Sequence, residues 1–148
     1  MDRLFLDANV FFSAAYRLNA RLLQLWELKD TILCSSHYAV EEAGINLTDE
    51  GQRRRLSELS AALHLFEAVA RQLPPGVSLP EKDVPIILAA IEARATHLLT
   101  GDIRHFGPYF GKKIESIQIL LPGEYLRRRV GKTLIADGKS GRRRPVDG

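Results

Sequence analysis

Four acidic residues in this chain each stand where a short apolar segment begins or ends. Asp7 follows RLFL, Glu42 follows CSSHYAVE, Asp83 opens DVPIILAAIEA, and Asp102 closes THLLTGD. Carboxylates from separate segments repel one another and raise their own pKa values when they meet without a cation. Mg²⁺ and Mn²⁺ prefer oxygen ligands, and such ions assist phosphodiester hydrolysis. If the four acids converge, they predict a divalent metal site suited to phosphoryl chemistry.

The choice of Glu42 over Glu41 depends on helical angle. The apolar stripe of the helix predicted over 37–47 consists of Ala39, Val40, Ala43 and Leu47. At about 100° per residue, Glu42 lies roughly 115° from the centre of this stripe and Glu41 roughly 145°. Glu42 is therefore the better candidate for the rim of a cleft. The same arithmetic excludes Glu92, which lies near the opposite face of its helix from Asp83.

Each acid also has an ordinary structural interpretation. Asp7 could cap the following helix, and Asp83 could be a first-turn acid that the helix dipole favours. Glu42 could be a solvated helix residue, and Asp102 could be a turn residue after Thr-Gly. Because all four fall on the same predicted edge of a sheet, the shared site is the favoured interpretation.

Neutral polar and aromatic residues stand beside these acids. Asn9 and Thr100 could orient a carboxylate or a metal-bound water, and structural hydrogen bonding explains them equally well. His105 is interpreted chiefly as a loop-packing residue, with RNA contact or proton transfer as the alternative. Trp26 and the aromatic residues of the first predicted helix are interpreted as core or dimer contacts rather than as a surface for base stacking.

Length and composition indicate one folded domain. The chain has 148 residues, 45% hydrophobic and 26% charged, as in ordinary globular proteins. No apolar run approaches the roughly 20 residues of a membrane span, and the start MDRLFLD lacks the pattern of a signal peptide. A single cysteine, Cys34, excludes an internal disulfide and a thiolate-based zinc site. We expect a cytoplasmic protein with a domain over 1–129 and a flexible basic tail over 130–148.

The net charge of +3 is unevenly distributed. From Arg127 to the end there are eight Lys or Arg and two Asp, a balance of +6, whereas the preceding residues carry 13 basic and 16 acidic groups, a balance of −3. A basic segment of this kind suits nucleic acid or an acidic partner, and a solvated terminal extension explains it equally well. The glycine-rich, aperiodic ending GKTLIADGKSGRRRPVDG predicts no fixed structure.

Apolar runs of strand length alternate with helical periodicity along the chain. Strands are predicted over 3–6, 31–34, 77–79, 97–100 and 114–121, and helices over 10–28, 37–47, 52–72, 81–95 and 122–129. Ser35 or Ser36 is the natural N-cap of the second helix. The alternation predicts a mainly parallel α/β sheet with helices on both faces. Ligands of such sheets lie outside the carboxyl ends of the strands, where Asp7 and Asp102 are predicted.

Three segments resemble the successive motifs of PIN domains, whose well-known small bacterial members are the VapC-type toxin ribonucleases. They are LFLDANVFFSA, SSHYAVEEAGINL and LPEKDVPIILAAIEARATHLLTGDIRHFG, and the similarity runs from about Arg3 to Leu126. The resemblance implies an α/β/α sandwich, an RNA substrate, a cognate antitoxin and a homodimer. It also implies a Mg²⁺- or Mn²⁺-dependent ribonuclease site of Asp7, Glu42, Asp83 and Asp102, supported by Asn9 and Thr100.

One residue departs from the family pattern, and other functions stay open. Ala8 stands where many members have a hydroxyl residue, which removes a hydrogen bond but no metal ligand. The chain could be an RNA-processing nuclease that is not a toxin, or a PIN-fold protein that binds RNA or a partner without catalysis. A receiver-like phosphate-signalling module shares the acidic edge, but paired acids after the first strand and a lysine after the last are not evident.

Overall fold

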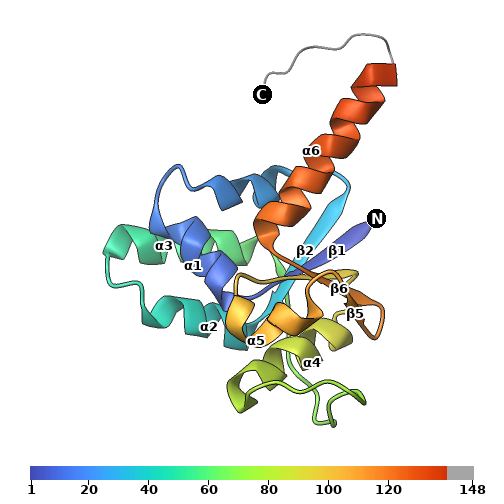
Figure 1. Ribbon diagram of the computed structural model, residues 1–148. Coiled ribbons are helices and arrows are strands. Elements are labelled where there is room, and N and C mark those ends of the chain that lie inside the picture. The colour runs from blue at the N-terminus through green and yellow to red at the C-terminus, as the bar shows by residue number, and fades with distance from the viewer. Residues whose placement is uncertain (140–148) are drawn as a thin grey trace.

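A six-stranded sheet forms the centre of the computed structural model, which describes the backbone of residues 1–139 and the side chains of residues 1–130. The strands are β1 (Asp2–Leu6), β2 (Thr31–Ser36), β3 (His64–Phe66), β4 (His97–Leu99), β5 (Lys113–Ile114) and β6 (Ile117–Leu120). Their order is β3-β2-β1-β4-β6-β5, and all neighbours are parallel except β5 and β6 (Figure 1). The mainly parallel sheet predicted from the sequence is confirmed.

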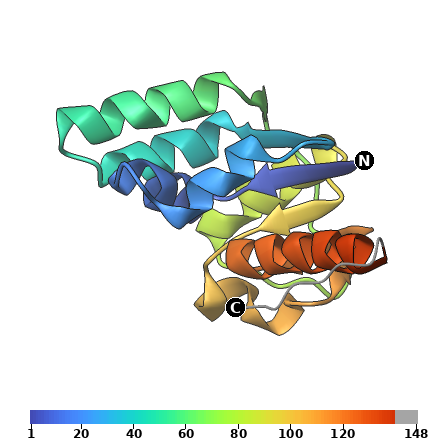
Figure 2. The ribbon, with the colours of Figure 1, turned by 90° about the horizontal axis from the view of Figure 1, so that it is seen from above.

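Helices cover both faces of this sheet. They are α1 (Ala8–Tyr16), α2 (His37–Ile45), α3 (Glu50–Ala61), α4 (Val84–Glu92), α5 (Ile103–Phe106) and α6 (Pro122–Lys139), with 3-10 helices η1 (Arg21–Glu27), η2 (Glu81–Asp83) and η3 (Gly107–Tyr109). Alternate side chains of β1 point to opposite faces of the sheet. Phe5 packs in the hydrophobic cluster that includes α4, and Leu4 and Leu6 pack in the hydrophobic cluster that includes α1 and the start of α6. Figure 2 looks onto the side that carries α1, α3 and α6. The fold is the expected α/β/α sandwich.

The direction in which strands are added reverses at β1. The chain places β2 and β3 on one side of β1, and then β4 and β6 on the other. At such a switch point the loops that leave the two central strands diverge, and a crevice opens outside their carboxyl ends. Asp7 directly follows β1 and Thr100 directly follows β4, so the topology places both beside this crevice.

Two neighbouring serines fix the start of α2. The Ser36 hydroxyl oxygen accepts a hydrogen bond from the Ala39 backbone N–H at 3.1 Å, which is the N-cap expected from the sequence. The Ser35 hydroxyl donates instead to the Leu6 carbonyl at 2.6 Å. The beginning of α2 is therefore tied to the end of β1, and the helix is held beside Asp7.

Two helices are shorter than the sequence predicts. The helix expected over 10–28 ends at Tyr16, where the chain becomes extended before it re-forms as η1. The helix expected over 52–72 ends at Ala61, because the residues that follow pair in parallel with β2 as β3. A three-residue strand is too short to show its own period, so its apolar residues extended the helical pattern.

Other elements also differ from the predictions. Residues 77–79 form no strand, and Val77 and Leu79 instead pack from a loop onto the cluster with α4. The strand expected over 114–121 is a hairpin of β5 and β6, turning at Glu115 and Ser116.

The closing helix is longer than the predicted 122–129. It continues as α6 to Lys139, so the first part of the predicted flexible tail is helical. Ion pairs of Glu124 with Arg127 and Arg128, one turn further on, support its beginning. Residues 140–148 of the predicted tail lie outside the described residues. No helix in the described part of the chain is long and apolar enough to cross a membrane.

Candidate functional site

Asp7 stands at the switch point between β1 and β4. Its backbone N–H donates to the Leu99 carbonyl at 3.1 Å, which continues the β1–β4 ladder one step beyond β1. Its side chain is also the N-cap of α1, since Oδ1 accepts from the Ala8 backbone N–H at 2.6 Å. The capping role that the sequence allowed for Asp7 is thus real, and it occupies one carboxylate oxygen.

Asn9 and Thr100 hold the other Asp7 oxygen in place. The Thr100 hydroxyl donates to Asp7 Oδ2 at 2.8 Å and accepts from the Asp102 backbone N–H at 3.0 Å. The Asn9 amide nitrogen lies 3.5 Å from the same Asp7 oxygen, and the Asn9 amide oxygen accepts from the Gly101 N–H at 2.7 Å. The loop after β4 and the start of α1 are therefore joined through the carboxylate of Asp7.

Burial makes the charge on Asp7 unfavourable. The residue is only 4% exposed. The pKa of Asp7 is raised to about 6, chiefly by loss of solvent, with a smaller contribution from the charges of Asp83 and Asp102. Hydrogen bonds from Thr100 and Ala8 act in the opposite direction and keep the pKa from rising further. A carboxylate in this position is stabilised further by any cation that enters the site.

A second group joins Asp83, Asp102 and His105. Nδ1 of His105 lies 2.9 Å from Asp102 Oδ2 and 2.9 Å from Asp83 Oδ2, but only the contact with Asp102 has hydrogen-bond geometry. Asp83 Oδ2 is buried and has no hydrogen-bond partner among the described residues. Desolvation and then the charge of Asp102 raise the pKa of Asp83, while the proximity of His105 lowers it.

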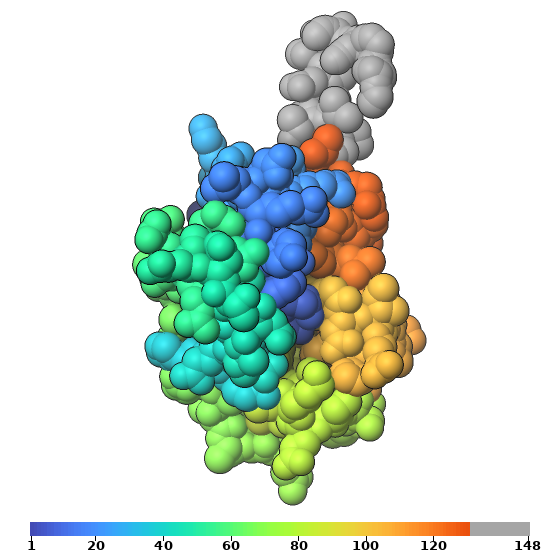
Figure 3. Space-filling view, turned by 90° about the vertical axis from the view of Figure 1, so that its left-hand side faces the viewer, coloured from blue at the N-terminus to red at the C-terminus, as the bar shows by residue number. Residues whose placement is uncertain are grey.

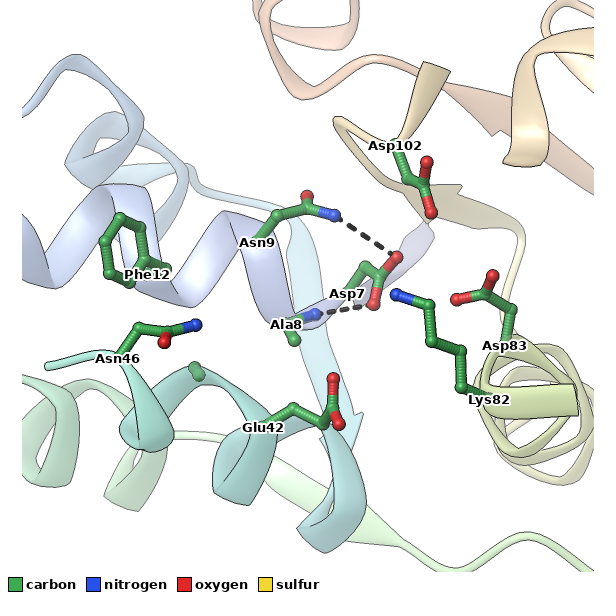
Figure 4. Close-up of a pocket in the computed structure, with 10 residues that line it drawn as sticks. Asp7, Ala8, Asn9, Phe12, Glu42, Asn46, Lys82, Asp83 and Asp102 are labelled. Atoms are coloured by element: carbon green, nitrogen blue, oxygen red, sulfur yellow. Dashed lines mark hydrogen bonds between the residues drawn. The ribbon is translucent and has the colours of Figure 1, made fainter. Parts of the chain in front are cut away.

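Glu42 completes the set from the opposite wall. It lies on the half-buried side of α2, whereas Glu41 is exposed, as the angular argument predicts. A cleft of about 270 Å³ is lined by Asp7, Glu42, Asp83 and Asp102 together (Figure 4). Figure 3 shows this face of the molecule hollowed where the segments of α2, α4 and α5 surround the start of α1.

Tyr38 ties the two walls of the cleft together near Lys82. The Tyr38 hydroxyl, one turn before Glu42 on α2, donates to the Lys82 carbonyl of η2 at 2.8 Å. Desolvation, followed by the charges of Glu42 and Asp83, raises the pKa of Tyr38 and keeps its hydroxyl protonated. The Lys82 side chain lines the cleft, and its ammonium points toward the carboxylates in Figure 4.

The chemistry of these side chains fits a hard divalent cation. One donor atom from each of Asp83, Asp102 and His105 lies within 4.8 Å of the others. A buried oxygen without a hydrogen bond, such as Asp83 Oδ2, is costly unless a positive group satisfies it. Asp7 and Glu42 line the same cleft outside this tight group, and all four acids offer oxygen ligands of the kind that Mg²⁺ and Mn²⁺ prefer.

The structure brings together all six residues singled out from the sequence. Asp7, Glu42, Asp83 and Asp102 line one cleft, and Asn9 and Thr100 bond to Asp7 as orienting groups.

The sequence reasoning missed Lys82, which adds a positive charge inside the cleft. It interpreted His105 chiefly as a loop-packing residue, whereas the structure places its ring against two of the acids, Asp83 and Asp102. The spacing of three residues between Asp102 and His105 is a signal that could have revealed their contact.

Comparison with known protein families agrees with this geometry. A family model described as "PIN domain" matches residues 3–104, more than two thirds of the chain. The matched segment contains β1, β4 and all four acids of the cleft. No curated protein matches the sequence closely enough to be reported as a relative. PIN domains are generally nucleases, and the carboxylate cluster could bind a metal ion, as such enzymes require. The chain belongs to the PIN domain family.

Proposed function

We propose that this protein is a Mg²⁺- or Mn²⁺-dependent endoribonuclease whose site is Asp7, Glu42, Asp83 and Asp102. The observation that carries the proposal is the convergence of these four carboxylates on one cleft at the switch point of the sheet. Burial makes the ionised forms of Asp7 and Asp83 unfavourable, which a bound cation would offset. A divalent cation in the cleft would neutralise phosphate charge and lower the pKa of the attacking water.

Other residues of the site orient the carboxylates and contact the substrate. Thr100 and the Ala8 N–H fix both oxygens of Asp7, so that this carboxylate is oriented before substrate binds. Nδ1 of His105 is hydrogen-bonded to Asp102 Oδ2 and lies 2.9 Å from Asp83 Oδ2, so this ring links the two carboxylates. Lys82 supplies a positive charge at the cleft, where it can contact a phosphate oxygen of the substrate.

The long basic helix contributes less to this cleft than the charge pattern suggests. α6 begins after β6, at the edge of the sheet where the site lies. Its far end projects beyond the opposite edge, the edge at which β1 begins (Figures 1 and 2). Arg127 and Arg128 near its start pair with Glu124. We therefore assign phosphate binding at the site to Lys82 and the bound cation. The basic helix is proposed to contact RNA further from the cleft or a protein partner.

Cleavage of a mixed-sequence RNA tests the proposal directly. We expect Mg²⁺- or Mn²⁺-dependent cleavage that a chelator stops and that Asp83→Asn reduces at least about 100-fold, since the variant removes a proposed ligand. Glu92→Gln is a matched control, because Glu92 is exposed on α4, the helix that directly follows Asp83, and does not line the cleft. Equal cleavage by the two variants would contradict the assignment.

A cytoplasmic toxin of a toxin–antitoxin pair is the biological role that we propose for this nuclease. The resemblance of three sequence segments to VapC-type toxins supports this role. From the same resemblance we propose a cognate antitoxin as partner and a homodimer as the assembly. Expression of the chain alone is expected to arrest growth, and co-expression of a cognate antitoxin is expected to restore it. Normal growth together with RNA cleavage in vitro would instead favour an RNA-processing nuclease.

A further inference from the structure

The cleft that contains the carboxylates has a second end with different chemistry. Phe12 of α1 and Asn46, the residue that follows α2, line the cleft on the side away from Asp83 and Lys82 (Figure 4). Neither residue carries a charge. This end of the cleft presents an aromatic ring and an amide, whereas the other end presents acids and an ammonium group.

Helical spacing builds both walls of the cleft. On α1, Ala8 and Phe12 are four residues apart, and the same spacing separates Glu42 of α2 from Asn46, the C-cap of that helix. Residues four apart lie on one face of a helix. Each wall therefore extends from the carboxylates to a residue about 6 Å, or slightly more than one turn, further along the chain. Ala8 and Ala43 line the cleft between these ends, and their small side chains keep it open.

The two residues at this end differ in how firmly they are held. Phe12 is half-buried against the core, and its ring centroid lies 5.3 Å from that of Tyr16. A ring fixed in this way loses little conformational freedom when it binds a ligand. Asn46 is exposed, and its amide has no hydrogen bond to any residue that the structure describes. That amide offers two donor hydrogens and an acceptor oxygen.

We propose that Phe12 and Asn46 form a nucleobase subsite, an inference that rests on the proposed ribonuclease function. The Phe12 ring stacks on the base beside the scissile phosphate, and the Asn46 amide hydrogen-bonds to the edge of that base. Unpaired RNA bases are recognised by aromatic stacking together with hydrogen bonds to their edges. The charges agree with this orientation, because the phosphate lies at the charged end and the neutral base at the neutral end.

The size of the cleft favours an unpaired base. Its volume of about 270 Å³ is slightly below the roughly 300–1,000 Å³ of pockets that enclose drug-sized ligands. Such a space accepts part of one strand rather than a base pair. A paired base would first have to leave its stack, at a cost of about a few kcal/mol. The substrate class is therefore single-stranded or loop RNA.

Base stacking can be measured separately from cleavage. An Asp7→Asn background prevents cleavage, and 2-aminopurine placed beside the mapped cut site reports stacking through loss of its fluorescence. We expect quenching on binding, and we expect Phe12→Leu to abolish it and to weaken binding about 5- to 100-fold, the scale of one base–aromatic stack. Phe12→Trp should retain both the quenching and the affinity. Asn46→Ala should weaken binding and reduce the preference among bases at this position.

Ile45→Ala is the matched control for Asn46, because Ile45 precedes it in the chain, is 70% exposed and does not line the cleft. With Asp7 intact, Phe12→Leu should raise KM and leave kcat close to that of the unmodified protein. Unchanged quenching and KM in Phe12→Leu, or equal affinity for duplex and single-stranded RNA, would overturn the base subsite and leave the nuclease proposal standing.

Failure of the nuclease proposal gives a different pattern. If the unmodified protein cleaves no RNA with either metal, quenching that disappears in Phe12→Leu would still support the base subsite in an RNA-binding protein. Absence of single-stranded RNA binding would overturn both proposals. A protein partner whose binding depends on Phe12, together with RNA binding that does not, would assign this end of the cleft to that partner and overturn the subsite.

Discussion

The edge of the sheet where the parallel strands begin and the edge where they end differ in what destabilises them: backbone strain at the first and buried charge at the second. Backbone strain lies at the edge where the parallel strands begin. All non-glycine residues with positive φ in the described part of the chain lie there: Asp30 at 61°, Arg94 at 56°, Glu115 at 50° and Ser116 at 82°. The edge where the strands end has no such residue, and instead buries the carboxylates of Asp7 and Asp83.

We expect that the backbone strain can be removed by substitution without loss of function, whereas the buried charges cannot. The positive φ values belong to tight connections that enter strands, and glycine would adopt them without strain. The buried charges belong to the groups that we propose to act on RNA, so we expect their removal to stabilise the fold and to abolish the activity. Such a conflict between stability and function is typical of active sites.

Replacement of Asp7 should give the largest effect. We expect Asp7→Asn to lower RNA cleavage at least about 1,000-fold, since it removes a proposed metal ligand and a charge that stabilises the cation. The fold should persist, because asparagine has the shape of aspartate and its amide oxygen can still accept the hydrogen bond from the Ala8 N–H, although it cannot also accept the one from Thr100. Cleavage rates and thermal unfolding of the same preparation test both statements, and an active Asp7→Asn variant would contradict the first.

The pH dependence of stability should be the next largest effect. The pKa of Asp7 rises from 3.8 to about 6 on folding, so the folded state holds this proton more tightly than the unfolded state. Stability from this group is fully present below about pH 4, is lost as the pH rises through about 6, and amounts to up to about 3 kcal/mol. Denaturant unfolding without metal should therefore show Asp7→Asn gaining on the unmodified protein from pH 4.5 to 7.5. A constant difference between them would contradict the burial argument.

Loss of the Thr100 hydroxyl should have a smaller effect. Thr100→Val keeps the shape of the side chain but removes the donor to Asp7 Oδ2. We expect activity to fall about 10- to 100-fold, as for other groups that orient a ligand, and stability to fall by about 1–3 kcal/mol. Thr100→Ser is the control that retains the hydroxyl and should recover most of the activity. Equal losses in both variants would point to packing rather than to the hydrogen bond.

Relief of strain at the opposite edge should give the smallest effect. Glu115 and Ser116 form a two-residue hairpin turn with positive φ at both positions, which favours glycine at the second. Ser116→Gly should stabilise the protein by up to about 1 kcal/mol without any change in RNA cleavage. Ser57→Gly within α3 should instead destabilise it by about 1 kcal/mol. A change in cleavage on Ser116→Gly would show that the two edges are not independent.

The same contrast explains which features the sequence predicted. Acids that directly follow apolar strands are visible in one dimension, so Asp7 and Asp102 could be assigned to the strand ends before the structure was known. The helical period then placed Glu42 on the cleft side of α2. The four residues as metal ligands, and the domain boundary near residue 129, stay predictions.

What the sequence did not predict depends on contacts between distant segments. The three residues of β3 are strand only because β2 lies beside them. The turn at Glu115 and Ser116 contains no glycine, so the sequence shows no sign of a hairpin there. The buried Asp83 oxygen lies beside His105, which belongs to a separate element, and no local pattern encodes that contact. Phe12 fitted the apolar stripe of its helix, and only the position of α2 shows that it also lines the cleft.

Mn²⁺ binding at pH 7.5, measured by calorimetry and electron paramagnetic resonance, tests the central claim most directly. The account predicts that the unmodified protein and Glu92→Gln bind Mn²⁺ with equal affinity, and that Asp83→Asn binds it at least about 10-fold more weakly. RNA cleavage should fall in parallel with Mn²⁺ occupancy across these proteins. Mn²⁺ affinity unchanged by Asp83→Asn, or RNA cleavage without bound metal, would contradict a metal-dependent nuclease site at these carboxylates.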